Sequence, residues 1–383
     1  MSRSYLILDA YYPSFLEAHY AQHPEIANLG YEDALARLMA TCFGTSDFYS
    51  TNLRSLGNVA AEIVANDAEL QAKWASSANL RPARFSNERA VASRVPYLKR
   101  FVEPARWQET VLVEQVKAAR PDVLYVQDLL LCTSGFLSRI RPFVKLVVGQ
   151  IASPLPPDSF LRGVDLVLTS CPHFVQRFRD RGIPTEYFRL GFESSLLGRL
   201  TSTPASYGAV FVGGMTNLHV KGNEVIRHAA GRVDLDVWGY GFEDLPSDSP
   251  ILRRFHGEAW GLDMYNVLKG AKIVVNRHGE VAENYASNMR LFEATGVGSL
   301  LITDEKDNLG EFFEVGKEIE TYGDPDELVD KIKYFLTHEE QRARIACAGQ
   351  ARTLREHTYL HRMRELEQLL EPHLRHLQGS SNQ

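Results

Sequence analysis

Short apolar runs alternate with amphipathic segments along most of the chain. The runs are rich in Val, Ile and Leu and end at Gly, Pro or polar residues, while the segments between them carry apolar residues at helical spacing. This alternation predicts parallel β-sheets covered by helices, an α/β fold. Strands are expected at 5–10, 121–128, 143–153, 164–170, 185–191, 209–214, 235–241, 271–279, 299–304 and from 318.

A change of composition divides the pattern into two series. Residues 201–208 (TSTPASYG) are rich in Ser, Thr, Pro and Gly, and the strand pattern restarts directly after them. We therefore expect an N-terminal Rossmann-like domain at 1–200 and a C-terminal one at 208–350. Residues 351–383 predict a helix that packs back on the N-terminal domain and ends in a frayed tail. Residues 11–78 are expected to be mostly helical.

Composition and charge exclude several classes of protein. The 383 residues include 44% hydrophobic and 23% charged residues, as in soluble globular proteins. Lys plus Arg total 42 and Asp plus Glu 48, a net charge of −6, which disfavours a nucleic-acid binder. The four cysteines form no CxxC pair, which argues against a zinc ribbon or a disulfide framework. No apolar run approaches the roughly 18 residues of a membrane span, so we expect a cytoplasmic protein.

The densest group of polar residues follows an expected strand. Asn276, Arg277 and His278 come directly after AKIVV, so they either face solvent or line a cleft. Ligands of open α/β sheets bind at the carboxyl ends of strands. A helix expected to begin at Ser287 or Asn288 offers free N–H groups to a diphosphate, and Arg290 adds a charged donor.

Arg290 and Glu293 allow two interpretations. Glu293 lies five residues after Asn288, roughly 7.5 Å along a helix, which matches the distance from a phosphate to a ribose whose hydroxyls a carboxylate binds. Alternatively, Arg290 and Glu293 form an i, i+3 ion pair on the surface.

A second glycine-containing signal ends the strand AVFV. Gly213 and Gly214 permit close approach of the backbone to a phosphate, although a tight turn without a ligand explains them equally well. The segment lacks the complete GxGxxG pattern, which argues against an NAD-dependent dehydrogenase.

Taken together, the segments FVGGM, DVWGYG, FHGEAWGLDMYNVLKGAKIVVNRHG, NMRLFEATGVGSLLITD and REHTYLHRM resemble the C-terminal half of GT-B glycosyltransferases. More narrowly, the chain resembles the spore-maturation (CgeB-like) branch of the group-1 family, and the N-terminal YYPSFLEAHY, FGTSDFYSTNLRSLG and YVQDL resemble its acceptor-side half. The resemblance implies two Rossmann-like domains facing across a cleft, a nucleotide-sugar donor on the second domain and an acceptor on the first.

Carried over to this sequence, the resemblance assigns a set of donor-binding residues. It places Glu293 on the donor ribose and Asn288, Arg290, Gly213 and Gly214 near the diphosphate. We add Asn276 and Arg277 to the donor site, and expect catalytic roles for Arg290 and His278. Many retaining GT-B enzymes carry another glutamate eight residues before the ribose-binding one. Tyr285 stands there instead, so Glu280 and Glu283 are the candidates for contacts with the donor sugar.

The acceptor side is expected at strand ends of the first domain. The candidates are Asp9, Tyr11, Tyr12, Gln127 and Gln150. Asp128 is the candidate general base if the reaction inverts the anomeric centre, and the N-cap of a helix is its alternative role.

Two patterns have metal-ligand spacing without further support. Asp234 and Asp236 form a DxD pattern at the start of a strand, and His357 and His361 stand four residues apart on a helix without a third ligand. We therefore expect neither a metal nor another cofactor.

The sequence contains one basic segment. Residues 81–106 hold seven Lys or Arg against two Glu, a charge of +5. This is either a solvated surface or a site for an anionic acceptor, such as a lipid diphosphate at the inner face of the membrane.

These features predict a metal-independent glycosyltransferase that moves a sugar from a nucleotide diphosphate to a hydroxyl of a glycan or lipid-linked glycan. The resemblance implies retention of configuration and a role in surface polysaccharide synthesis. A sugar-nucleotide epimerase of the same fold and a noncatalytic protein that binds nucleotide sugar or glycan remain as alternatives.

Overall fold

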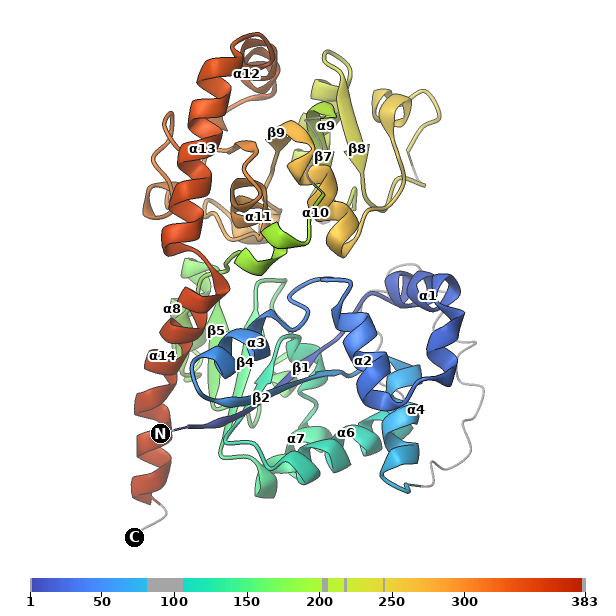
Figure 1. Ribbon diagram of the computed structural model, residues 1–383. Coiled ribbons are helices and arrows are strands. Elements are labelled where there is room, and N and C mark those ends of the chain that lie inside the picture. Colours follow the sequence, from blue (N-terminus) through green and yellow to red (C-terminus); the bar gives the residue numbers. More distant parts are fainter. Residues whose placement is uncertain (1, 81–105, 202–205, 217–218, 244, 381–383) are drawn as a thin grey trace. The chain divides into compact units, whose positions relative to one another are not determined.

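The computed structural model describes residues 2–80, 106–201, 206–216, 219–243 and 245–380. Its contacts divide the chain into two compact units, each with its own sheet (Figure 1). Unit 1 comprises residues 1–169, 173–187 and 363–383, and unit 2 comprises residues 170–172 and 188–362. The basic segment 81–106 lies outside the described side chains, as do residues 202–205 of the expected linker.

Unit 1 contains a six-stranded sheet in the order β2-β1-β3-β4-β5-β6, with every neighbouring pair parallel. The central strands are apolar along their whole length because helices cover both faces of such a sheet. The strands are β1 (Ser4–Asp9), β2 (Val59–Val64), β3 (Val123–Val126), β4 (Leu146–Ile151), β5 (Leu166–Thr169) and β6 (Thr185–Tyr187).

Residues 11–78 are mostly helical, as expected, but they also contain strand β2, which the sequence pattern did not predict. Its sequence VAAEIV contains Ala and Glu, which favour helices in isolation. Pairing with β1 from Val59 to Val64 overrides that preference. As a result, the side chain of Glu62 lies inside the unit, only 6% exposed.

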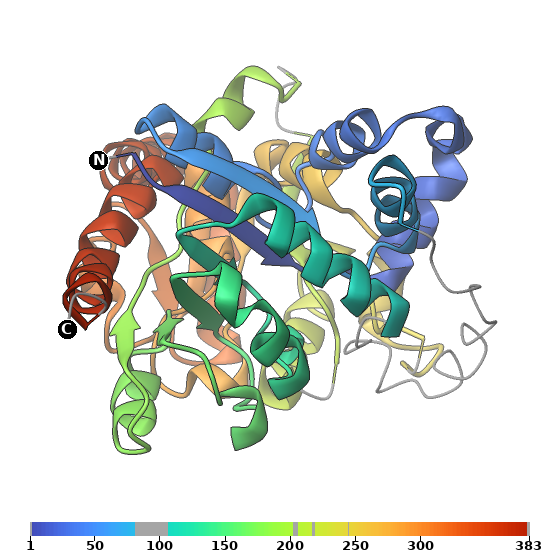
Figure 2. The same ribbon diagram turned by 90° about the horizontal axis from the view of Figure 1, so that it is seen from below.

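The helices of unit 1 lie between and around these strands. Helices α6 and α7 contact each other and cross the sheet on one face, drawn in teal in Figure 2, whereas α3 packs against β1 and β2. Asp67 caps α4, and Thr133 caps α7 through a hydrogen bond to the Phe136 N–H. The helices are α1 (Pro13–Gln22), α2 (Tyr31–Met39), α3 (Phe48–Ser55), α4 (Ala68–Ser77), α6 (Arg106–Ala119), α7 (Ser134–Ile140) and α8 (Pro172–Arg179).

Unit 2 contains a five-stranded parallel sheet in the order β11-β10-β9-β7-β8. All five strands were expected from the apolar runs. They are β7 (Tyr207–Val212), β8 (Leu235–Trp238), β9 (Ala271–Val275), β10 (Leu300–Asp304) and β11 (Glu320–Tyr322).

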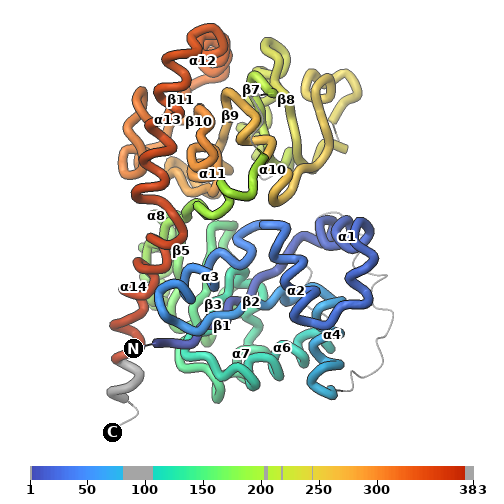
Figure 3. The backbone as a smooth tube through the Cα atoms, viewed as in Figure 1, coloured from blue at the N-terminus to red at the C-terminus, as the bar shows by residue number. Residues whose placement is uncertain are grey.

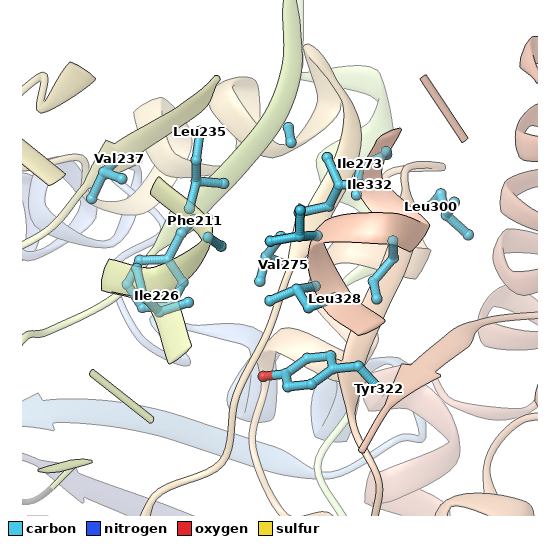
Figure 4. Packing of buried hydrophobic residues seen from close by; sticks show 14 of the residues in the cluster. Phe211, Ile226, Leu235, Val237, Ile273, Val275, Leu300, Tyr322, Leu328 and Ile332 are labelled. Carbon is cyan, nitrogen blue, oxygen red and sulfur yellow. The ribbon is translucent and has the colours of Figure 1, made fainter. Parts of the chain in front are cut away.

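Alternate residues of these strands build the core of unit 2. Phe211, Val275 and Leu300 point to the face covered by α9 and α12, where Ile226 and Leu328 meet them (Figure 4). Helix α13 lies beside β10 and α11 (Figure 3). The helices are α9 (Val220–Ala230), α10 (Gly261–Lys269), α11 (Arg290–Gly296), α12 (Pro325–Thr337), α13 (Glu339–Glu356) and α14 (Tyr359–Ser380).

Helix α14 continues into unit 1 from Met363 onward. Its side chains Leu366, Leu370 and Leu374 are buried. Glu367 accepts a hydrogen bond from Asn58, and Glu371 pairs with Arg3. None of the helices in the described ranges combines the length and the apolar character that crossing a membrane requires.

Candidate functional site

Polar side chains gather at the carboxyl ends of β7, β9 and β10 in unit 2. Because all strands are parallel, these ends share one edge of the sheet. Arg277, two residues beyond β9, donates to the Gly214 carbonyl at 2.7 Å, and Arg290 donates to the Val212 carbonyl at 3.1 Å. The expected donor-binding segments after β7, after β9 and at the start of α11 therefore meet.

Arg277 is a buried cation in this group. It is 7% exposed, and its Nη2 also donates to Asn223 Oδ1 at 2.6 Å. Burial lowers its pKa to about 10, so the guanidinium stays charged at neutral pH. Within the described residues it forms no ion pair, and its buried Nε has no hydrogen-bond partner. A buried charge without a counter-ion is costly, which makes this position suited to an anion.

Arg290 and Glu293 form the expected i, i+3 ion pair at 2.7 Å, but the pair does not lie on the surface. The two side chains are 14% and 7% exposed. Glu293 Oε1 also accepts a 3.4 Å hydrogen bond from the Tyr265 hydroxyl. Arg290 therefore has a carboxylate partner inside the protein, which Arg277 lacks.

Asn276 and Asn288 hold the loop that carries Arg277. Asn288 Nδ2 donates to Asn276 Oδ1 at 2.9 Å and to the Arg277 carbonyl at 3.0 Å. Asn276 Nδ2 donates in turn to Thr303 Oγ1 at 2.9 Å. Helix α11 was expected to begin near Ser287 or Asn288, and it begins at Arg290, two residues after Asn288. The Asn288 side chain instead bonds to the neighbouring loop.

His278 is fixed by a carboxylate at the end of β10. Its Nδ1 lies 2.7 Å from Asp304 Oδ1, and its ring is fully buried. Burial of Asp304 opposes ionisation, but the hydrogen bond from His278 and the charge of Lys306 lower its pKa to about 2. Since Asp304 is therefore ionised at neutral pH, Nδ1 carries the proton of the pair. His278 Nε2 has no hydrogen-bond partner among the described residues.

Glu280 and Glu283, the candidates for contacts with the donor sugar, lie in and directly after the short helix Glu280–Ala282. Glu280 Oε1 accepts a hydrogen bond of 3.0 Å from the Lys221 N–H in the first turn of α9. Glu283 has a positive φ of 50°, and its carbonyl accepts from Lys306 at 3.1 Å. Their proposed contacts with the donor sugar stay predictions.

The expected acceptor-side residues lie at the strand ends of unit 1. Asp9 ends β1 and accepts from the Ala10 N–H at 2.7 Å. Burial, together with the charge of Asp128, raises its pKa to about 7, although the Ala10 hydrogen bond opposes the shift. Asp128 accepts from the Leu130 N–H at 2.9 Å and so caps the short helix Leu129–Leu131, which was its alternative role.

The other acceptor-side residues are held by neighbours within unit 1. Gln127 accepts from Thr45 at 2.8 Å, and Gln150 accepts from Tyr125 at 2.6 Å. Tyr11 and Tyr12 contact the ring of Phe43, and Tyr11 is buried.

The two metal-like patterns have structural partners. Asp236 is buried and accepts from both Arg254 and His256, whereas Asp234 is 87% exposed. His357 Nε2 lies 3.0 Å from the Phe312 carbonyl, and His361 bonds to Thr358. No cluster of three metal-ligating side chains occurs in the described parts of the chain.

The structure adds residues that the sequence interpretation missed. Tyr265 reaches Glu293 from α10, and Asn223 reaches Arg277 from α9. Asp304 holds His278 and is itself paired with Lys306. Asp304 ends an expected strand, so the rule that polar residues at strand ends form sites predicts it. Tyr265 and Asn223 lie within helices and carry no comparable signal.

Residues 223–368 match a protein-family model described as glycosyl transferase-like. No curated protein matches the chain at a significant level. Several solved structures match over nearly the full length of both chains. HepE from Anabaena, in complex with UDP and glucose, aligns with a TM-score of 0.58 at 15% identity, covering 97% of this chain and 100% of that one. Sucrose-phosphate synthase from Thermosynechococcus elongatus aligns with a TM-score of 0.55 at 14% identity, covering 97% of this chain and 99% of that one.

A third similar structure comes from another class of enzyme. A protein from Listeria monocytogenes assigned as a UDP-N-acetylglucosamine 2-epimerase aligns with a TM-score of 0.52 at 11% identity, covering 98% of both chains. These likenesses establish the fold. Membership of the CgeB-like branch stays a prediction. The chain has the α/β fold of GT-B glycosyltransferases, and its second half resembles a glycosyltransferase-like family.

Proposed function

We propose that this protein is a glycosyltransferase whose unit 2 binds a nucleotide diphosphate sugar. The observation that carries the proposal is that the buried Arg277 guanidinium, which forms no ion pair with any residue the structure describes, bonds to the carbonyl of the Gly213-Gly214 turn. The glycosyltransferase-like family match and the UDP-bound structure of HepE support it.

In the proposed reaction, the bond between the anomeric carbon and the diphosphate oxygen breaks, and its electron pair leaves with the diphosphate. The acceptor hydroxyl bonds to the anomeric carbon and transfers its proton to an oxygen of the departing diphosphate. Arg277 stabilises the charge that develops on the diphosphate, since donors that are already in place act most strongly there. Glu293 binds the donor ribose, and Asn276 and Asn288 hold the Arg277 loop in position.

The remaining parts of the proposal come from the sequence analysis: the acceptor and the retention from the resemblance, the location from the lack of a long apolar run, and the membrane contact from the charge of 81–106. The acceptor is a glycan or a lipid-linked glycan in surface polysaccharide synthesis, and the reaction proceeds with retention and without a metal. We place the protein in the cytoplasm, with the basic segment 81–106 contacting the inner face of the membrane.

A thermal-shift panel tests donor binding and the absence of a metal requirement. UDP, GDP, dTDP, CDP, ADP and NAD are each added at 1 mM with and without EDTA. A ligand at 100 times its dissociation constant adds about 2.7 kcal/mol of stability, so a binding nucleotide raises the Tm visibly. We expect a rise with a nucleoside diphosphate that persists in EDTA. A rise with NAD alone, or one that EDTA abolishes, contradicts the proposal.

Replacing Arg277 with methionine is expected to weaken binding of that nucleoside diphosphate by about 10- to 100-fold, because a charge-assisted hydrogen bond is worth about 1.5–3 kcal/mol. Titration calorimetry measures the change. Arg232→Met is the matched control, because Arg232 is an exposed arginine of the same unit. If both variants bind the nucleotide with equal affinity and Arg277→Met keeps its Tm, Arg277 does not contact the nucleotide.

Two other assays separate the alternatives. A sugar-nucleotide epimerase, the activity assigned to the Listeria neighbour, converts its donor without any acceptor, which NMR of the sugar detects. A noncatalytic binding protein binds the nucleotide sugar but forms no product from it with any acceptor. A glycosyltransferase instead requires an acceptor for product formation and loses activity with Glu293→Ala.

A further inference from the structure

Two aromatic rings lie beside the Gly213-Gly214 turn. Tyr240 follows β8 by two residues, and Trp260 directly precedes α10. Their rings are stacked, with centroids 5.6 Å apart and planes 23° from parallel. Both residues are half-buried.

Gly214 links this aromatic pair to Arg277. A Cβ atom on Gly214 would lie 2.6 Å from Cζ of Tyr240, so the ring lies directly against the backbone of the turn. The carbonyl of the same residue accepts the hydrogen bond from Arg277. Met215 N–H donates to the Tyr240 carbonyl at 2.8 Å, which fixes the loop after β8 to the loop after β7. An aromatic surface and a buried cation therefore flank one glycine.

Helix α10 links the aromatic pair to Glu293. Trp260 is the N-cap of α10, and Tyr265 lies five residues further, roughly 7.5 Å along the axis. The Tyr265 hydroxyl contacts Glu293 Oε1. The aromatic pair, the candidate ribose carboxylate and the candidate diphosphate cation thus belong to one connected group of side chains. A nucleoside diphosphate has the same three parts in its base, ribose and phosphates.

We propose that the nucleobase of the donor stacks on Trp260, which Tyr240 supports from behind, between the indole ring and the Gly214 backbone. The inference rests on the proposed function and adds the base-binding residues to it. Stacking uses the π-face that every base possesses, so this surface supplies affinity for the base without choosing among bases. The Trp260 indole N–H donates to Glu258 at 2.9 Å, which fixes the rotation of the indole ring.

Calorimetry with two probes tests this role. The probes are the nucleoside diphosphate that gives the largest shift in the panel and inorganic pyrophosphate, used as its competitor. Trp260→Leu and Tyr240→Leu are expected to lower the affinity for the nucleoside diphosphate by about 5- to 100-fold, the effect of removing a base-stacking ring. The affinity of pyrophosphate is expected to stay unchanged. Tyr334→Leu, which removes a 42% exposed ring elsewhere in unit 2, is the control.

Two outcomes overturn the inference. Unchanged nucleotide affinity in both variants, at preserved Tm, means that the base binds elsewhere. Equal weakening of both probes means that the rings support the Gly213-Gly214 turn and do not contact the base. These results differ from failure of the proposed function, in which the wild-type protein binds no nucleoside diphosphate.

Discussion

Replacing Gly239 with alanine is expected to lower the Tm of unit 2 by about 6 °C or more and to abolish nucleotide binding. A Cβ atom at this position would lie 2.0 Å from the Gly213 carbonyl oxygen, a rigid backbone atom. Gly239 also has a φ of +141°, a conformation essentially restricted to glycine. Strain and overlap together cost about 3 kcal/mol or more, and each kcal/mol lowers the Tm of a unit of this size by about 2–4 °C.

The overlap falls on the turn that the donor is proposed to contact. Gly213 N–H donates to the Trp238 carbonyl, so the turn cannot move without breaking this link to β8. Differential scanning calorimetry measures the stability. Gly310→Ala is the control in the same unit, since its added Cβ would meet nothing within 4 Å. A Gly239→Ala protein as stable as Gly310→Ala would show that the two loops do not approach in this way.

Replacing Glu62 with glutamine is expected to stabilise unit 1 at pH 8, by about 2 °C or more in Tm. Glu62 is buried, accepts a 3.0 Å hydrogen bond from the Ser50 N–H, and forms no ion pair with any described residue. Burial raises its pKa well above 4.5, and the charge of Asp9 raises it further, although the Ser50 hydrogen bonds oppose the shift. The native carboxyl thus binds its proton more tightly than the unfolded one.

The sign of the pH dependence follows from this raised pKa. The stabilising contribution of Glu62 is complete below its unfolded pKa and is lost as the pH rises through the folded value. The advantage of Glu62→Gln is therefore largest at pH 8 and shrinks as the pH falls toward 5. Thermal unfolding at several pH values measures it. Glu17→Gln is the exposed control and should show no such trend. A constant difference across the pH range would mean that Glu62 titrates normally.

Most of the fold could be predicted from the sequence because parallel strands buried on both faces are continuous apolar runs. Strand β2 was missed because Ala and Glu weaken this signal, and only pairing with β1 shows that it is a strand. The parts of the candidate site that directly follow a strand could be predicted from their positions in the sequence. Arg277 and His278 follow a strand, and the sheet brings them to the same edge as Gly214.

Contacts between distant segments could not be predicted in the same way. The sequence alone does not distinguish the roles of Arg277 and Arg290, because both are arginines in the expected donor-binding segments. Glu293 on the next turn pairs with Arg290, whereas the partners of Arg277 among the described residues are uncharged: the Gly214 carbonyl, the Asn223 amide oxygen, the Met215 sulfur and the Phe211 ring. The partner of His278 lies 26 residues away on another strand, at a distance that helix or strand spacing does not encode.

The return of α14 to unit 1 determines the order in which the units can be completed during synthesis. Residues 363–375, which bury leucines and supply Glu367 and Glu371 to Asn58 and Arg3, leave the ribosome after the whole of unit 2. Although its first strand is made at the start of translation, unit 1 is the second unit to be finished. The surface of unit 1 that α14 later covers therefore stays exposed while about 175 residues of unit 2 are made. The nascent unit 1 must avoid aggregation during this time.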